Sequence, residues 1–123
     1  MQNSNEKFKI ELKHRIYNWV LRLIKFIDVL PKTSVCQVMG KQLLRSGTSI
    51  IANFVEAQAA SSRKDFANFI TYALKSANES KVWLALLRDT GNGSKIEGEW
   101  LLKELLEIAN ILAKIILSTK GKK

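Results

Sequence analysis

Residues 35–59, VCQVMGKQLLRSGTSIIANFVEAQA, are the stretch that decides the fold of this chain. It runs for about 25 residues without a proline, far longer than an ordinary β-strand. Its apolar and small residues recur every three or four positions, at Cys36, Met39, Leu43, Gly47, Ile50 and Phe54. This spacing places them on one side of a helix. The stretch is therefore predicted to be a long amphipathic helix.

Three further stretches of similar length show the same periodicity, over residues 6–30, 64–90 and 95–118. Each has an apolar stripe at helical spacing. The first stripe is Phe8, Leu12, Ile16, Trp19, Val20, Leu23, Phe26, Ile27 and Leu30, the second is Phe66, Phe69, Ile70, Ala73, Ala77, Leu84 and Leu87, and the third is Leu101, Leu105, Ile108, Leu112, Ile115 and Ile116. Four helices are predicted.

Residues that start and stop helices separate these four stretches. Pro31 closes the first, and Ser34 with Gln37 forms a capping box that opens the second. Ser62 and Ser94 begin two more such boxes, each with a carboxylate three residues later. Short connections place neighbouring helices antiparallel. The predicted fold is all-α, an antiparallel up-down-up-down four-helix bundle that forms one domain over residues 1–123.

The composition narrows the possible functions. The chain has 123 residues, 46% of them hydrophobic and 25% charged, which is ordinary for one packed domain. One cysteine, Cys36, and one histidine, His14, argue against a disulfide framework, a zinc site and a Ser-His-Asp triad. We expect no metal, no cofactor, no catalytic residue and no enzymatic activity. The absence of a signal-like or membrane-spanning run predicts a cytoplasmic protein without membrane contact.

The first predicted helix has apolar residues on two sides. Ile10, Tyr17, Leu21 and Ile24 lie nearly opposite its core stripe. Further apolar residues flank the stripes of the second and fourth helices, at Leu44, Ile51, Val55, Leu102, Leu106, Ala109, Ala113 and Leu117. One interpretation is a wide core with scattered apolar residues at the surface. The favoured one is burial against other copies of the chain, because exposed patches of this size are unusual on a monomer.

A polar seam runs beside the apolar stripe of the second helix and continues on the third. Antiparallel pairing of the two helices places Arg45 level with Glu79, and Ser46 level with Ser76, in a half-buried groove. The seam comprises Arg45, Ser46, Asn53, Glu56, Ser76 and Glu79. Glu56, Glu79 and the serines could suggest a metal site or a nucleophile, but the sequence lacks the further ligands that a metal needs and the histidine base that a serine nucleophile needs. A structural hydrogen-bonded network, or a contact between copies, is the favoured interpretation.

The same residues carry a resemblance to a known family. Leu43-Leu-Arg-Ser-Gly-Thr-Ser-Ile50 followed by Ile51-Ala-Asn-Phe-Val-Glu-Ala57, with Ala73-Leu-Lys-Ser-Ala-Asn-Glu79 on the third helix, resembles the bacterial proteins encoded in intervening sequences of 23S ribosomal RNA genes. The resemblance covers nearly the whole chain. It implies a four-helix bundle that assembles as a ring of five subunits, and a molecular role that is poorly defined. The six seam residues occupy the positions of the family pattern, without a catalytic role.

The resemblance also suggests a partner. The family is similar in fold to Avd, the accessory protein of diversity-generating retroelements, which is a basic pentamer that binds nucleic acid. The net charge here is +9, spread evenly along the chain, and five copies at +9 each would carry about +45. Such a charge favours a polyanion as partner. The candidate phosphate-binding residues are Arg15, Arg22, Lys25, Arg63 and Lys64. The hypothesis is sequence-tolerant binding of RNA or other nucleic acid, and the alternative is a scaffold or accessory subunit that binds a protein.

Overall fold

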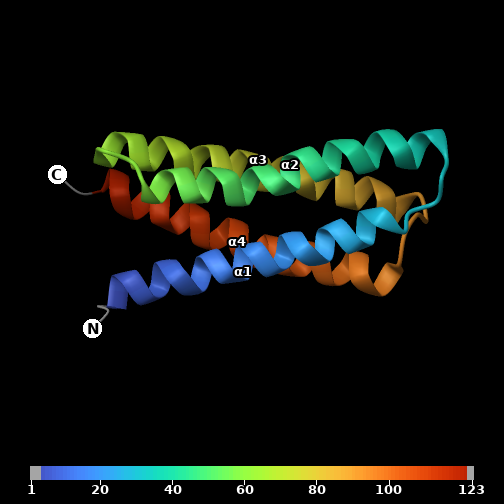
Figure 1. Cartoon of the computed structure of the whole chain (residues 1–123), viewed down its shortest axis with the longest axis horizontal. Coiled ribbons are helices and arrows are strands. Elements are labelled where there is room, and N and C mark those ends of the chain that lie inside the picture. The colour runs from blue at the N-terminus through green and yellow to red at the C-terminus, as the bar shows by residue number, and fades with distance from the viewer. Residues whose placement is uncertain (1–3, 122–123) are drawn as a thin grey trace.

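The computed structural model describes residues 4–121, which form four long helices joined by short turns (Figure 1). The helices are α1 (Ser4–Asp28), α2 (Ser34–Gln58), α3 (Arg63–Asp89) and α4 (Lys95–Lys120). Their ends fall within two residues of the predicted ones, and the described range contains no strand, so the all-α prediction is confirmed. Residues 1–3 and 122–123 of the predicted domain lie outside the described range. None of the four helices is both long and apolar enough to span a membrane.

Side-chain caps fix where three of the helices begin. Ser62 and Ser94 each accept a hydrogen bond from the backbone N–H three residues later, as predicted. The prediction for α2 was wrong by one residue. Thr33, not Ser34, is the cap, because Thr33 has an extended backbone and its Oγ1 accepts from the Cys36 N–H at 3.2 Å, while Ser34 is already helical.

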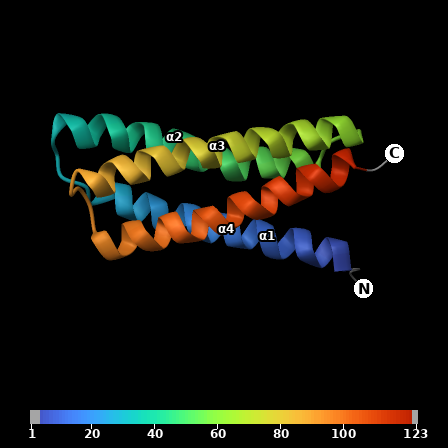
Figure 2. The same ribbon diagram turned by 180° about the vertical axis from the view of Figure 1, so that it is seen from behind.

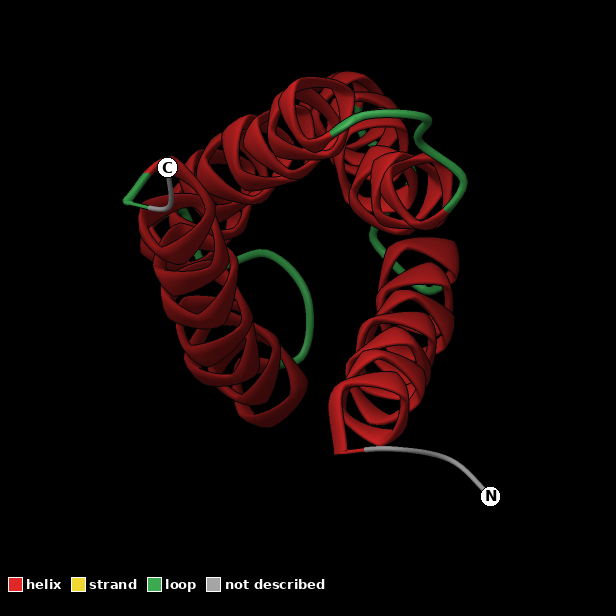
Figure 3. Cartoon of the chain, turned by 90° about the vertical axis from the view of Figure 1, so that its left-hand side faces the viewer, coloured by secondary structure: helices red, strands yellow, loops and turns green. Residues whose placement is uncertain are grey.

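The helices pack as neighbours in chain order, and both chain ends lie at the same end of the bundle (Figures 1 and 2). The α2–α3 pair shares the most extensive contact and the α1–α4 pair the least. Figure 3, which looks along the bundle, shows the four helices around one common interior. Successive helices run in opposite directions, which agrees with the predicted antiparallel order.

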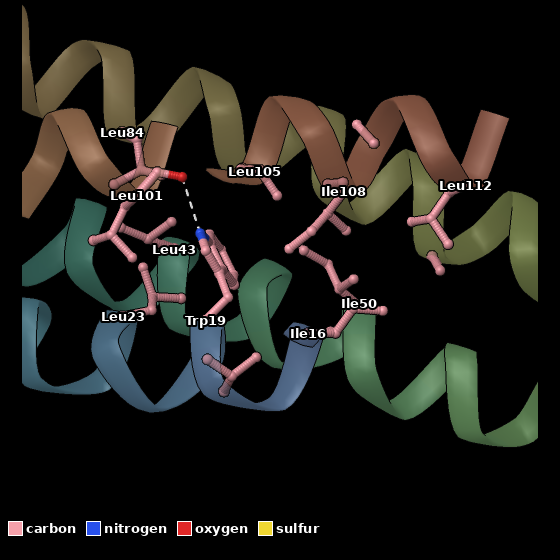
Figure 4. Packing of buried hydrophobic residues seen from close by; sticks show 14 of the residues in the cluster. Ile16, Trp19, Leu23, Leu43, Ile50, Leu84, Leu101, Leu105, Ile108 and Leu112 are labelled. Atoms are coloured by element: carbon pink, nitrogen blue, oxygen red, sulfur yellow. Dashed lines mark hydrogen bonds between the residues drawn. The ribbon is translucent and has the colours of Figure 1, made fainter. Parts of the chain in front are cut away.

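The predicted stripes meet in that interior, which is a single apolar core. Trp19 is completely buried, and its indole N–H donates to the backbone carbonyl of Leu101 on α4 at 2.9 Å (Figure 4). A buried indole N–H needs such a partner, since leaving it unbonded would be costly. Cys36 is also buried, as predicted for a small core residue. One interhelical bond thus links the largest core side chain of α1 to α4.

Two glycines allow close approach at tight points of the bundle. A side chain on Gly47 would collide with Leu23 of α1, so its absence lets α1 and α2 pack closely. Gly93, in the turn between α3 and α4, has a φ of 85° and lies against the ring of Phe26. The left-handed backbone and the lack of space both require glycine there.

The structure corrects three details of the predicted core. Phe8 was placed on the core stripe, but its side chain is 46% exposed, because the start of α1 diverges from the end of α4 (Figure 1). Ala109, placed on a flank of α4, is buried. Leu30 is buried as predicted but lies two residues beyond the end of α1.

Candidate functional site

The polar seam contains an exposed cluster around Arg45. The guanidinium donates to Gln42 Oε1 from Nε at 3.1 Å and from Nη2 at 2.9 Å, and Nη2 also pairs with Glu79 Oε2. The predicted Arg45–Glu79 pairing is therefore confirmed. The expected half-buried groove is not, because the two side chains are 58% and 36% exposed.

The Glu79 carboxylate is held in its charged form by two donors. The Trp83 indole N–H donates to Oε2 at 3.0 Å, one helical turn away on the same helix. This bond, and after it the Arg45 guanidinium, lowers the pKa of the Glu79 carboxyl from its usual value. The carboxylate therefore accepts hydrogen bonds at neutral pH and does not supply a proton. A fixed acceptor of this kind suits a structural contact between α2 and α3.

A buried serine pair is formed by the residues that follow Arg45 and Glu79 in the sequence. Ser46 Oγ and Ser80 Oγ are 2.7 Å apart, and both side chains are completely buried. Ser80 Oγ also donates to the carbonyl of Ser76 at 2.8 Å, which makes Ser46 the donor to Ser80. The predicted level of Ser46 with Ser76 is therefore off by one helical turn. Ser80 was the residue missed, and its four-residue spacing from Ser76 was the signal that pointed to it.

The remaining two seam residues do not join this cluster. Asn53 is half-buried, and its Nδ2 donates to the carbonyl and to the Oγ of Ser49, both on α2. Glu56 is exposed, and it lies eleven residues after Arg45, roughly 16 Å further along the helix. The six seam residues thus make three separate structural contacts and one exposed carboxylate, with no shared cavity.

Arg15, one of the predicted phosphate-binding residues, pairs with carboxylates of α4. Its Nε and Nη2 donate to the two oxygens of Glu104 at 2.6 and 2.8 Å, and Nη2 reaches Glu107 at 2.9 Å. The Glu104 bond raises the pKa of the Arg15 guanidinium and lowers the pKa of the Glu104 carboxyl. This two-pronged pairing leaves little of the guanidinium for a phosphate.

Arg22, two helical turns further along α1, also pairs with a carboxylate of α4. It donates to both oxygens of Glu97 at 3.2 and 2.8 Å, and its guanidinium lies 3.5 Å above the centre of the Trp100 ring. Both interactions fix the side chain against α4. The sequence placed Arg15 and Arg22 on a basic face but could not show that acidic residues of α4 face them. Their geometry supports a structural role.

The other three predicted phosphate-binding residues are all exposed. Lys25 lies near the end of α1, and Arg63 and Lys64 begin α3 at the opposite end of the bundle. The structure therefore does not bring the five residues together into one site. All ion pairs between residues of the described range use arginine and none uses lysine. The surplus positive charge is thus carried at the surface by lysines, among them Lys9, Lys41, Lys103 and Lys114.

Residues 4–121 contain no group of three or more histidine, cysteine, aspartate or glutamate side chains that could hold a metal ion. His14 is exposed on α1. The pKa changes most clearly for Arg15, Glu79 and Glu104 of the pairs described above, and for Arg88 and Asp89, which form an exposed pair. These groups stabilise the bundle through their pairing.

A groove near the chain ends was missed by the sequence analysis. It lies between the start of α1 and the end of α4 and is lined by Asn5, Phe8, Lys9, Ile111, Lys114, Ile115, Ser118 and Thr119. Phe8 had been assigned to the core, so the periodicity concealed it. One sequence feature could have indicated the exposure of Phe8. The residue lies within the first two turns of α1, next to Lys9, and side chains at a helix end often lack a packing partner.

Comparison with known proteins gives two positive findings. The sequence model of the family described as 23S rRNA-intervening sequence protein matches residues 9–114. The chain is also similar to a crystal structure from Bacteroides thetaiotaomicron, described as a protein with unknown function from the S23 ribosomal protein family. The two share 36% identity with a TM-score of 0.76, over 85% of this chain and 97% of that one. No protein with a curated description matches the chain.

Proposed function

Since the chain belongs to the family of 23S rRNA-intervening sequence proteins, we propose that it is a non-enzymatic homo-oligomer that binds nucleic acid through its lysine surface. A ring of five subunits is the assembly that the family resemblance implies. The proposed location is the cytoplasm, where RNA is available. The observation that carries the proposal is that Arg15, Arg22 and Arg45 pair with carboxylates of neighbouring helices, whereas the exposed lysines of residues 4–121 form no ion pair with another residue of that range.

Lysine and arginine differ in what they recognise. A guanidinium reads a planar pair of acceptors, such as a guanine edge or a phosphate, whereas a lysine ammonium acts as a mobile point charge. A surface that offers lysines will bind the phosphate backbone with little preference for base sequence. The chain carries 20 Lys and Arg against 11 Asp and Glu, which supplies the excess charge for this binding. We therefore propose sequence-tolerant, salt-dependent contacts.

The outer face of α1 supports the proposed self-association. Ile10, Tyr17, Leu21 and Ile24 are 40–54% exposed and point away from the core. Together with His14 they are spaced alternately by four and three residues, from position 10 to position 24, which is the spacing of a coiled-coil seam. Such a seam on the outside of a bundle fits against a helix of another subunit. Burial there would remove apolar side chains from water.

Self-association would concentrate the charge. Five copies at +9 each carry about +45, and charge of one sign at that density strongly attracts polyanions. The lysines lie along all four helices, so a ring would present them around its whole surface. The proposed complex is therefore an oligomer bound along an RNA or other nucleic-acid backbone.

Two measurements test the two parts of the proposal. Fluorescence anisotropy with labelled RNA at increasing salt should show binding at low salt whose affinity falls steeply as salt rises. Absence of binding at low salt would overturn nucleic-acid binding. Light scattering after size exclusion should show a mass several times 13.9 kDa, and replacing Tyr17 and Leu21 by serine should reduce it. A monomer at micromolar concentration would overturn the oligomer.

A second candidate function is a scaffold that binds a partner protein. It is favoured by a shallow groove between α3 and α4, where Leu102 and the half-exposed Leu106 are flanked by Lys81, Lys103 and Glu99. Purification from cell extract after nuclease treatment distinguishes the two functions. A partner protein retained after nucleic acid is digested, and lost when Leu106 is replaced by serine, would favour the scaffold.

A further inference from the structure

The groove between α1 and α4 combines an aromatic ring with lysines on both walls. Phe8 is 46% exposed, and Ile111 and Ile115 of α4 continue the apolar floor. Lys9 on α1 and Lys114 on α4 are exposed at its edges. The groove exists because the two helices diverge toward the chain ends, as Figures 1 and 2 show. A large aromatic side chain is thereby left in contact with solvent beside two cations.

The charges of the groove select an anionic occupant. None of its eight lining residues is acidic, although α1 and α4 together contain six glutamates within the described range. The four acidic residues of α4 lie in its first half, at positions 97–107, where Arg15 and Arg22 pair with three of them. The last turns of α4 therefore contribute only lysines as charged groups. The complementary ligand is negatively charged and has a flat apolar part.

We propose that this groove binds a single-stranded segment of nucleic acid, with one base stacked on Phe8 and the adjoining phosphates against Lys9 and Lys114. This site rests on the proposed nucleic-acid binding and gives it a location. An exposed aromatic ring between cations is the arrangement with which proteins hold single strands without reading their sequence. A duplex keeps its bases stacked inside and offers only phosphates, so the groove distinguishes single strands from duplexes.

An acidic amphipathic peptide is the competing occupant, and the geometry favours it less. Such a helix needs a long apolar track, whereas the apolar floor here consists of one phenylalanine and two isoleucines. The amide of Asn5 and the hydroxyl of Ser118 at the edges suit the polar edges of a base or sugar.

The test uses fluorescence anisotropy with labelled oligothymidylate and with a duplex of equal length. Phe8→Leu keeps an apolar side chain but removes the ring, and Tyr72→Leu removes an equally exposed ring on α3 as its control. Phe8→Leu should weaken single-strand binding about tenfold, Phe8→Trp should restore it, and duplex binding should not change. The double variant Lys9→Gln/Lys114→Gln should lower the slope of log Kd against log salt concentration by about 1.4. This change is measured relative to the control Lys41→Gln/Lys103→Gln, which removes the same amount of charge.

Each outcome decides between the site and the function it rests on. The wild type could bind the single strand while Phe8→Leu and the Lys9/Lys114 double variant weaken binding no more than their controls do. That result would overturn the groove as the binding site but leave the proposed nucleic-acid binding intact. No binding of either probe at low salt would overturn both. An acidic helical peptide that binds in a Phe8-dependent way, and that oligothymidylate fails to displace, would assign the groove to a protein partner and overturn our proposal. Thermal melts of all variants should match the wild type, because Phe8 and the two lysines are exposed.

Discussion

The α2–α3 pair and the α1–α4 pair are held together in different ways. Between α2 and α3 the contact is extensive, and a completely buried Ser46–Ser80 hydrogen bond lies within it. Between α1 and α4 the direct contact is small. Besides the shared apolar core, the link there consists of one buried indole bond, from Trp19, and of arginine–carboxylate pairs along the surface.

This difference shows how one bundle can be closely packed on one side and open on the other. Small residues in α2 and α3, such as Ser46, Ala73 and Ala77, let the backbones approach and leave no room for a ligand. The α1–α4 pair depends on long side chains that bridge a wider gap, and beyond Arg15 the bridging ends. The groove with Phe8 begins past that point, which is why the candidate binding surface lies on the α1–α4 side.

The largest expected effect concerns the single indole bond of the α1–α4 side. Trp19→Ala should lower the free energy of unfolding by about 3–5 kcal/mol, because it leaves a cavity in the core and removes the bond to Leu101. Trp19→Phe should cost about half as much, since a ring remains. Urea denaturation gives these values. Hydrogen exchange should show α1 losing protection first, and a uniform loss in all four helices would break the proposed contrast between the two pairs.

The buried serine pair provides the next test, on the closely packed α2–α3 side. Ser80→Ala should cost about 1–2 kcal/mol, because Ser46 Oγ then keeps only a long bond to the Leu43 carbonyl. Adding Ser46→Ala should cost little more, since no unpaired hydroxyl then remains. Thermal denaturation of the two single variants and the double variant measures this coupling. Additive losses would mean that the two hydroxyls do not depend on each other.

The Arg15–Glu104 pair predicts a pH dependence for the α1–α4 side. The pKa of the Glu104 carboxyl is lower in the folded chain than its usual value of about 4.5. The ionised carboxylate therefore stabilises the fold at pH values above about 4.5, and this stabilisation is lost as the pH falls through the folded-state pKa. Arg15→Gln should lower stability by about 1 kcal/mol at neutral pH, given side chains 34% and 17% exposed, and by less in acid. Melting temperatures across the acidic range, with Lys13→Gln as control, measure the difference. Equal losses at both pH values would contradict the pairing.

The sequence was sufficient for the helices and the core stripes because both follow from local periodicity. Stripe residues such as Ile16, Leu43 and Leu105 are completely buried, as helical spacing predicts. The errors arise where tertiary geometry enters. Phe8 has the helical phase of a core residue, but it lies where α1 and α4 diverge, so its ring reaches solvent. Ser46 contacts Ser80 because the relative axial position of α2 and α3 depends on the turn between them and on their packing.

The candidate site was harder to predict than the fold. Charge counts identified Arg15 and Arg22 as basic residues, but only the bundle shows that Glu97, Glu104 and Glu107, 75 to 92 residues later in the chain, face them from α4. Charge alone cannot separate a paired arginine from an available lysine. Similarly, residue spacing found the partners Arg45 and Glu79 but did not reveal how exposed they are.

The smallest expected effect is that of breaking this exposed Arg45–Glu79 pair. Arg45→Ala should destabilise the chain by less than about 1 kcal/mol, because both groups reach solvent and Glu79 keeps its bond from Trp83. A double-mutant cycle with Glu79→Ala, followed by thermal denaturation, gives the coupling energy. A loss of several kcal/mol would instead require the Glu79 carboxylate to be covered, since only a charge shielded from water becomes so costly when its partner is removed. In that event the surface between α2 and α3 would be buried in the proposed oligomer, and the closely packed side of the bundle would be the one that meets a neighbouring subunit.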